Sequence, residues 1–226
     1  HMALRYGLSQ VLLQAVAAHR RITMAEVLAD EFGLKLARHP APLLGSCGGN
    51  WHENVDKAIL RKLPYFPQTA MVRLDQLDAL PEYAGWISER IKKIGAASFT
   101  PTLHYDLHGL LSLRVGHDIK AAVAYLLEVE RACDGRPVLF EDPLDAGNKS
   151  DQIALMGELK AALRRSGSGI RLIADEWCNT RQDVADFVAS NCCDLIQIKM
   201  PGLGGVDNTV QACMTCTAGG IGIYLG

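Results

Sequence analysis

The sequence predicts an α/β fold in which parallel strands and helices alternate to build an incomplete (β/α) barrel. Short apolar runs alternate with helical patterns at intervals of roughly 25 to 35 residues, as in successive βαβ units. Several runs end in an acidic or basic residue. In a barrel the carboxyl ends of successive strands face the same opening, so these charged side chains could meet there. The first run leads into residues 45–49, which lack the G-x-G-x-x-G spacing of an open dinucleotide-binding sheet.

About seven strands are expected, over residues 42–45, 65–71, 102–106, 138–141, 171–175, 195–199 and 221–225. Apolar residues at three- and four-residue spacing predict helices over residues 77–94, 119–132, 150–165, 181–191 and 208–218. Residues 3–28 show the same helical pattern ahead of the first strand. We therefore divide the chain into a helical entry segment, residues 1–40, and a barrel domain, residues 41–226.

Composition narrows the class of partner. The 226 residues are 49% hydrophobic and 21% charged with a net charge of -2, so we expect no nucleic-acid and no membrane partner. The chain shows no signal peptide and no apolar run of the roughly 18 residues that a membrane span needs. The seven cysteines are odd in number, and the Cys213-x-x-Cys216 pair has no second pair or histidine at zinc spacing. We expect free thiols in a reducing cytoplasm.

Charged side chains stand at the ends of four successive predicted strands. Asp106, Glu141 and Asp175 each end an apolar run, and Lys199 ends the next one. In a barrel these ends face a common mouth, where three carboxylates repel one another unless a cation is present. A hard divalent ion accepts such oxygen ligands, so we predict that the three acids bind Mg²⁺. A single strand-ending acid more often caps a helix or forms a surface ion pair, but three in succession before a lysine favour the metal site.

The lysine then has a chemical role. A proton next to a carboxylate is weakly acidic, and a metal ion on that carboxylate stabilises the charge that forms when the proton leaves. Lys199, partly desolvated near a cation, is expected to have a lowered pKa and to act as the base. Asp142 and Glu176 neighbour two of the predicted ligands, and strand alternation should point them away from the mouth.

Several segments resemble the methylaspartate ammonia-lyases, a family of the enolase superfamily. The likeness runs over nearly the whole chain, and its most specific parts are Ala-Asp-Glu-Trp-Cys-Asn-Thr at residues 174–180 and Gln-Ile-Lys at 197–199. The other matching segments are residues 5–10, 54–57, 102–106 and 145–149. Enolase-superfamily sites are already known to pair a lysine or histidine base with Mg²⁺ on a TIM-type barrel.

The resemblance implies a magnesium-dependent elimination of ammonia from a small amino acid, 3-methylaspartate, to give mesaconate. It assigns removal of the C3 proton of the (2S,3S) substrate to Lys199. It also implies that Gln197 contacts the substrate and that His104 stands at a matching position, where a packed strand residue is an equal alternative.

Two positions differ from the family pattern. Gln68 stands where the family has a histidine that serves as a second base, and Ser46 stands where it has a substrate-contacting glutamine. An amide does not take up a proton at neutral pH, so we expect impaired processing of the epimeric substrate. Ser46 is shorter than glutamine, so we expect an altered pocket at that end of the substrate site.

The resemblance also bears on the architecture. The family has an amino-terminal capping domain and a barrel closed by an eighth strand, so residues 1–40 are expected to be a helical remnant of the cap and the eighth strand to be missing. An unclosed barrel exposes two strand edges, which favours a homo-oligomer. Two alternatives stay open: a catalytically impaired, shortened homologue that folds as an oligomer, and another enolase-superfamily enzyme acting on a carboxylate, such as an acid-sugar dehydratase or racemase.

Overall fold

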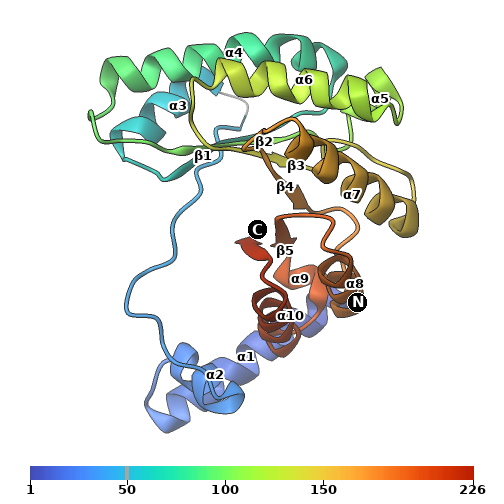
Figure 1. Cartoon of the computed structure of the whole chain (residues 1–226). Helices are drawn as coiled ribbons and strands as arrows, with labels where there is room; N and C mark the ends of the chain where they lie inside the picture. Colours follow the sequence, from blue (N-terminus) through green and yellow to red (C-terminus); the bar gives the residue numbers. More distant parts are fainter. Residues whose placement is uncertain (49–50) are drawn as a thin grey trace.

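A curled parallel sheet covered by helices makes up most of the chain (Figure 1). The computed structural model describes residues 1–48 and 51–226, so Gly49 of the glycine-containing run lies outside the described residues. Within these ranges six strands pair in chain order, each parallel to the next: β1 (Tyr65–Ala70), β2 (Thr102–Asp106), β3 (Val138–Glu141), β4 (Arg171–Ala174), β5 (Leu195–Ile198) and β6 (Gly222–Leu225). The helices are α1 (Met2–Arg20), α2 (Met24–Phe32), α3 (Trp51–Leu60), α4 (Leu74–Ile94), α5 (Leu111–Val115), α6 (Ile119–Ala132), α7 (Lys149–Arg165), α8 (Arg181–Ser190), α9 (Met200–Leu203) and α10 (Val206–Ala218).

The strand predicted over residues 42–45 is reduced to an isolated bridge. Leu44 pairs in parallel with Tyr65, and the N–H groups of Gly45 and Cys47 donate to the carbonyl oxygens of Tyr65 (2.9 Å) and Pro67 (2.7 Å). Within residues 42–45, which the structure describes, only Leu44 forms a bridge to β1, so this segment falls short of a strand. The other six predicted strands are present, and β2 and β3 have the predicted bounds.

The predicted entry helix is divided into two. Arg21 adopts a left-handed conformation (φ 55°) and ends α1. Thr23 then begins α2 with a capping box: its hydroxyl accepts from the Glu26 N–H (3.2 Å), and the Glu26 carboxylate accepts from the Thr23 N–H (2.6 Å). Apolar spacing continues on both sides of the break, which is why periodicity alone predicted one helical segment.

Alternation along the strands separates two faces of the sheet. The side chains that join the apolar core under the helices are every second residue: Leu103, Tyr105, Val138, Phe140, Leu172, Ala174, Ile196 and Ile198. The residues between them belong to the opposite, inner face of the curled sheet. Those nearest the carboxyl ends are polar: His104, Asp106, Glu141 and Gln197, followed by Asp175 and Lys199 just past their strands. The candidate site residues therefore share one face and one end of the sheet.

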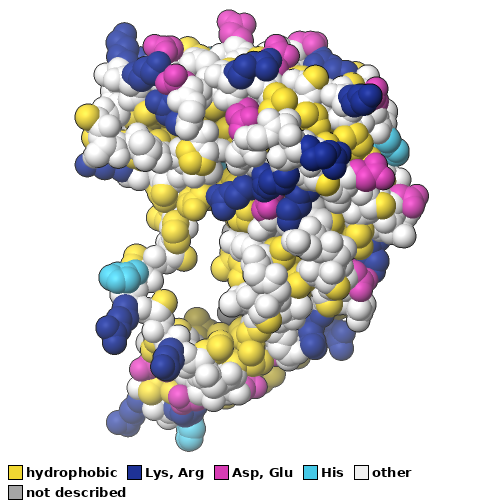
Figure 2. All heavy atoms as spheres, viewed as in Figure 1, with side chains coloured by type: hydrophobic (Ala, Val, Ile, Leu, Met, Phe, Trp, Pro, Cys, Tyr) yellow, Lys and Arg dark blue, Asp and Glu magenta, His cyan; other side chains and the backbone are white. Residues whose placement is uncertain are grey.

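Helix α1 links the beginning of the chain to its last elements. The Tyr6 hydroxyl lies 3.6 Å from Met200 Sδ, and the Val206 N–H donates to Ser9 Oγ (3.0 Å). Figure 2 shows apolar side chains around the opening between the extended segment after α2 and the C-terminal elements. The exposed apolar side chains of α1 are Leu4, Leu8, Val11, Leu12 and Val16. Despite these side chains, neither α1 nor any other helix in the described ranges is long and apolar enough to cross a membrane.

Truncation of the core is expected to cost substantial stability. Leu172 on β4 is fully buried in the layer between sheet and helices. Leu172→Ala should lower the free energy of unfolding by about 2–5 kcal/mol, since it removes buried methyl groups and leaves a cavity. Urea unfolding followed by circular dichroism measures this change. Leu113→Ala, at a 73% exposed position on α5, should change the same quantity by less than about 0.5 kcal/mol; equal losses in both variants would contradict the proposed packing.

Candidate active site

The ends of β2 to β5 gather the four charged residues predicted from the sequence. Asp106 and Glu141 end β2 and β3 and are direct partners in the parallel register. Asp175 follows β4, and Lys199 follows β5. The three acids are almost fully buried, with 4%, 0% and 5% of their surfaces exposed in that order. The register of the parallel strands thus places three carboxyl groups and an amine at one end of the sheet.

Two of the acids have a cationic or polar partner on the inner face. Lys199 Nζ lies 2.7 Å from Asp175 Oδ2 and forms an ion pair with it. His104 Nε2 lies 2.7 Å from Glu141 Oε2, and both side chains are 1% exposed. The imidazole of His104 is therefore a hydrogen-bond partner of the Glu141 carboxyl group and holds its Oε2 atom in place.

The third acid has a different set of neighbours. The Gln68 amide donates from Nε2 to Asp106 Oδ2 (3.3 Å). His108 Nδ1 lies 3.0 Å from Asp106 Oδ1, and this contact raises the pKa of His108. The Ser46 hydroxyl is exposed and donates to the Gln68 carbonyl oxygen (3.4 Å). Ser46 and Gln68, the two positions expected to differ from the family pattern, therefore lie side by side, and Gln68 contacts Asp106.

The acids fit a divalent cation by their chemistry, although they do not surround one as they stand. Within the described residues, no three His, Cys, Asp or Glu side chains form a group that could hold a metal ion, since each acid faces its own partner. Glu141 Oε1 and Asp175 Oδ1 are nevertheless buried and have no hydrogen-bond partner among those residues. Buried carboxylate oxygens without donors are costly, and they are the ligand type that Mg²⁺ prefers.

Burial and mutual repulsion control protonation in this cluster. Burial raises the pKa of Glu141 from 4.5 to about 10, and the charges of Asp106 and Asp175 add to the shift. Burial also raises the pKa of Asp175, against the opposing effect of Lys199. Burial lowers the pKa of His104 from 6.5 to about 4, so this imidazole is neutral at physiological pH. The cluster carries less negative charge than its composition suggests.

The net pKa shift of Lys199 is upward, whereas the sequence predicted a lowered pKa for this amine beside a bound cation. Partial burial lowers the pKa of the amine, as expected. The hydrogen bond to Asp175 and the nearby negative charges outweigh burial, and the net shift is upward. Carboxylates surround the amine in this arrangement, and a lowered pKa beside a bound cation stays a prediction.

Gln197 has an unsatisfied polar group at the same end of the sheet. It is 5% exposed, and its Oε1 atom is buried without a hydrogen-bond partner in the described part of the chain. The residue pairs with Tyr224 across β5 and β6, and the Tyr224 ring meets His104 edge-on at 5.4 Å. The inner wall therefore continues from the acids onto the last strand.

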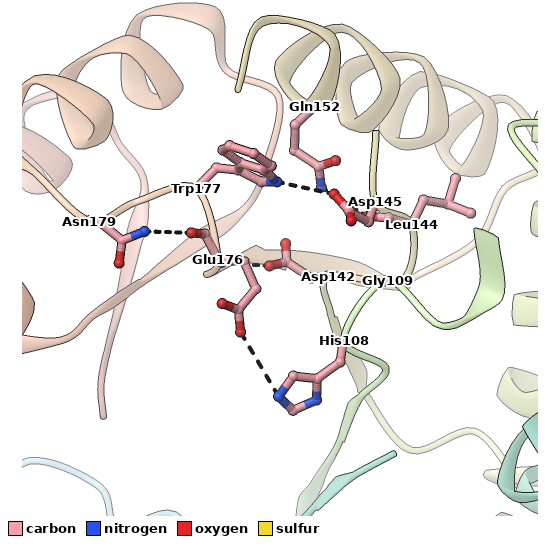
Figure 3. A pocket seen from close by; sticks show the side chains of 9 residues that line it. All are labelled: His108, Gly109, Asp142, Leu144, Asp145, Gln152, Glu176, Trp177 and Asn179. Atoms are coloured by element: carbon pink, nitrogen blue, oxygen red, sulfur yellow. Dashed lines mark hydrogen bonds and ion pairs between the residues drawn. The ribbon is translucent and has the colours of Figure 1, made fainter. Parts of the chain in front are cut away.

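A cavity of about 320 Å³ lies beside the acids (Figure 3). The residues that line it are His108, Gly109, Asp142, Leu144, Asp145, Gln152, Glu176, Trp177 and Asn179. Glu176 Oε1 connects it to the cluster, at 3.8 Å from Lys199 Nζ and 3.9 Å from His108 Nε2. Sequence reasoning missed His108, although its position two residues beyond Asp106 placed it at the same strand end.

The fold and the strand-end acids define a class, the (β/α)-barrel enzymes of the enolase superfamily. A muconate cycloisomerase from Pseudomonas fluorescens superposes with a TM-score of 0.68 at 18% identity, covering 98% of this chain and 54% of that one, which shows the shared fold alone. Residues 35–226 match the family described as methylaspartate ammonia-lyase C-terminus, and residues 1–33 match methylaspartate ammonia-lyase N-terminus. The chain belongs to the methylaspartate ammonia-lyase family.

Individual relatives agree with this assignment. Methylaspartate ammonia-lyase of Citrobacter amalonaticus is 38% identical over 100% of this chain and 56% of its own length, and that of Clostridium tetanomorphum is 34% identical over the same shares. The crystal structure of the Citrobacter enzyme containing (2S,3S)-3-methylaspartic acid superposes with a TM-score of 0.93, covering 99% of this chain and 56% of that chain. The Mg complex of β-methylaspartase from C. tetanomorphum gives 0.92 at 35% identity, with the same coverage. The chain spans about half the length of the curated relatives it matches.

Removal of the Glu141 carboxyl group should stabilise the metal-free protein as pH rises. A carboxyl group whose pKa is raised on folding stabilises the fold below its unfolded pKa of 4.5, and this stabilisation is lost as pH rises toward about 10. Glu141→Gln escapes that loss. With EDTA present, the Tm of the variant minus that of the wild type should increase from about pH 5 to about pH 8. Glu158→Gln, an exposed change on α7, controls for amide substitution, and a pH-independent difference for Glu141→Gln would contradict the expectation.

Proposed function

We propose that this chain carries the proton-abstracting site of a magnesium-dependent ammonia-lyase that converts 3-methylaspartate to mesaconate and ammonia. The observation that carries the proposal is the amine of Lys199 beside buried acids on neighbouring strand ends. Two oxygens of these acids have no hydrogen-bond partner among the described residues. Family membership and the substrate and Mg named for the two solved relatives support it. Residues 41–226 would form the barrel domain, with residues 1–40 as the helical part of a capping domain.

Asp106, Glu141 and Asp175 would hold the magnesium ion. Its charge would stabilise the negative charge that develops on the substrate carboxylate next to C3. For this role the side chains of Asp106 and Asp175 must turn from their present partners toward a common point with Glu141 Oε1. His104 would keep Glu141 Oε2 engaged. Glu141 Oε1, which has no hydrogen-bond partner in the described part of the chain, would then be free to be a ligand.

Lys199 would act as the base. Its amine must give up the hydrogen bond to Asp175 and be neutral before it can accept a proton from C3. The electron pair of the C3–H bond then forms the C2=C3 double bond, the C2–N bond breaks, and the substrate ammonium group leaves as ammonia. The Lys199 side chain is 42% exposed, so the ammonium form can return its proton to water.

Polar groups around the base would orient the substrate. Gln197 Oε1, which is buried with no hydrogen-bond partner in residues 1–48 and 51–226, would accept a hydrogen bond from the substrate ammonium group. Gln68 and Ser46 would line the side of the pocket next to Asp106. Because Gln68 carries an amide, Lys199 would be the single base, and proton removal would be confined to one face of C3.

We also infer a cytoplasmic, homo-oligomeric protein. The seven cysteines form no disulfide in the described structure, which suits a reducing compartment. Leu225 on β6 is 53% exposed, and the apolar side chains of α1 are open to solvent, which favours association with a second copy. Light scattering tests the oligomer, and a monodisperse monomer would count against it.

Loss of the base is expected to abolish turnover while metal binding persists. Lys199→Met should lower kcat for (2S,3S)-3-methylaspartate by about 10²–10⁴-fold, the usual contribution of a positioned base, with Mg²⁺ still bound. Ultraviolet absorbance of the conjugated product measures turnover, and calorimetry measures Mg²⁺ binding. Lys92→Gln, on the exposed side of α4, should retain wild-type turnover. A wild-type chain that binds Mg²⁺ and forms no product from either epimer would favour the catalytically impaired alternative.

Restoring a histidine next to Asp106 should broaden the stereochemistry. The wild type is expected to act on the (2S,3S) substrate and to show little turnover of its C3 epimer, because Gln68 cannot accept a proton. Gln68→His should raise turnover of the epimer, and Gln68→Asn, which keeps an amide, should not. Rates on both epimers, measured by the same absorbance assay, decide this, and wild-type turnover of both at equal rates would refute the single-base scheme.

A further inference from the structure

Asp142 connects the loops that follow three of the site strands. It is 4% exposed, and its Oδ2 atom accepts hydrogen bonds from the backbone N–H groups of Glu176 (2.7 Å) and Asp175 (3.2 Å). Its carbonyl oxygen accepts from the Gly109 N–H (2.6 Å), and its own N–H donates to the Ile173 carbonyl (3.0 Å). One residue after β3 therefore binds the loop after β2 and the turn after β4.

The backbone around Asp142 leaves little freedom. Asp142 has a φ of 34°, a left-handed conformation that non-glycine residues rarely adopt. Gly109, at φ 69°, lies so close to the next loop that a Cβ would be 2.4 Å from Asp145 Cβ. Such conformations persist where the surrounding contacts hold them, so the hydrogen bonds of Asp142 belong to a constrained junction.

The position of Asp142 is costly for a carboxyl group. Burial next to Asp175 and Glu176 raises its pKa to about 8, and a buried acid among other acids is unfavourable without donors. The two donors come from the backbone of Asp175 and Glu176, one of which is a proposed ligand. The side chain thus offsets its own burial by holding the turn that carries Asp175.

We propose that Asp142 is a positioning residue, which fixes the Asp175–Glu176 turn through its two backbone hydrogen bonds and so sets the direction of the Asp175 carboxylate for cation binding. The inference rests on the proposed function for the identity of the cation. The geometry itself does not depend on it, because the hydrogen bonds exist without metal. Side chains that support metal ligands typically change metal affinity by 10–100-fold when they are replaced.

Hydrogen exchange in metal-free protein tests the positioning directly. Asp142→Leu removes the acceptor at similar volume, Asp142→Ala removes it with the volume, and Asp142→Asn keeps an acceptor oxygen. Exchange of the Asp175 and Glu176 amides should be about tenfold faster or more in the Leu and Ala variants, since each loses a buried hydrogen bond, and close to wild type in the Asn variant. The Gly109 amide, which donates to the Asp142 backbone, is the internal control and should stay protected.

Magnesium titration gives the second measurement. Calorimetry should show the Kd for Mg²⁺ raised about 10–100-fold in the Leu and Ala variants and within about threefold of wild type in Asp142→Asn. Asp145→Ala is the matched control: this acid lines the same cavity, yet its Oδ1 accepts from Trp177 Nε1 and the Gly147 N–H. It should leave both the exchange at residues 175–176 and the Mg²⁺ affinity at wild-type values.

The outcomes distinguish the positioning role of Asp142 from the proposed magnesium-dependent function. Unchanged amide exchange at residues 175–176 in a folded Leu or Ala variant would overturn the positioning role, and so would an Asn variant as impaired as those two. If neither the Leu nor the Ala variant folds, Asp142→Asn decides, since it must retain both exchange protection and Mg²⁺ affinity. Absence of Mg²⁺ binding in the wild type would refute the proposed function, while the metal-free exchange would still decide the role of Asp142.

Discussion

Electrostatic repulsion between carboxyl groups governs the candidate site. The parallel register brings Asp106 opposite Glu141, and the next strand end adds Asp175. Buried carboxyl groups that repel one another are costly to ionise together unless a cation is present. The structure relieves this repulsion by giving the acids separate partners and by raising the pKa of Glu141. The ion pair between Lys199 and Asp175 follows from the same constraint.

Stability and chemistry come from opposite faces of the same strands. Every second side chain is apolar and packs under the helices, and the residues between them carry the acids, the amine and the amide. Burial of the outer face supplies the main folding energy, which offsets the cost of burying polar groups on the inner face. A change of one residue in strand register would exchange the two faces and abolish both core and site.

Much of the architecture followed from local pattern. Strands β2 and β3 and helix α6 have the bounds that the sequence predicted, because alternation and three- to four-residue spacing are strong over those residues. Prediction failed where local detail decides the outcome: of residues 42–45 only Leu44 bridges β1, and the capping box of Thr23 divides the entry helix. The acids and Lys199 were found because their strand-end positions could be counted along the chain.

The sequence by itself determined the class of fold, the family, and which charged residues stand at the strand ends, since these depend on local periodicity and on order along the chain. Only the tertiary structure decided which partner each charged group has. It placed His104 against Glu141, brought His108 to Asp106, paired Lys199 with Asp175, and directed the Asp142 carboxyl group to the backbone after β4. Protonation and orientation depend on desolvation and on neighbours within a few ångströms, and chain order does not specify those distances.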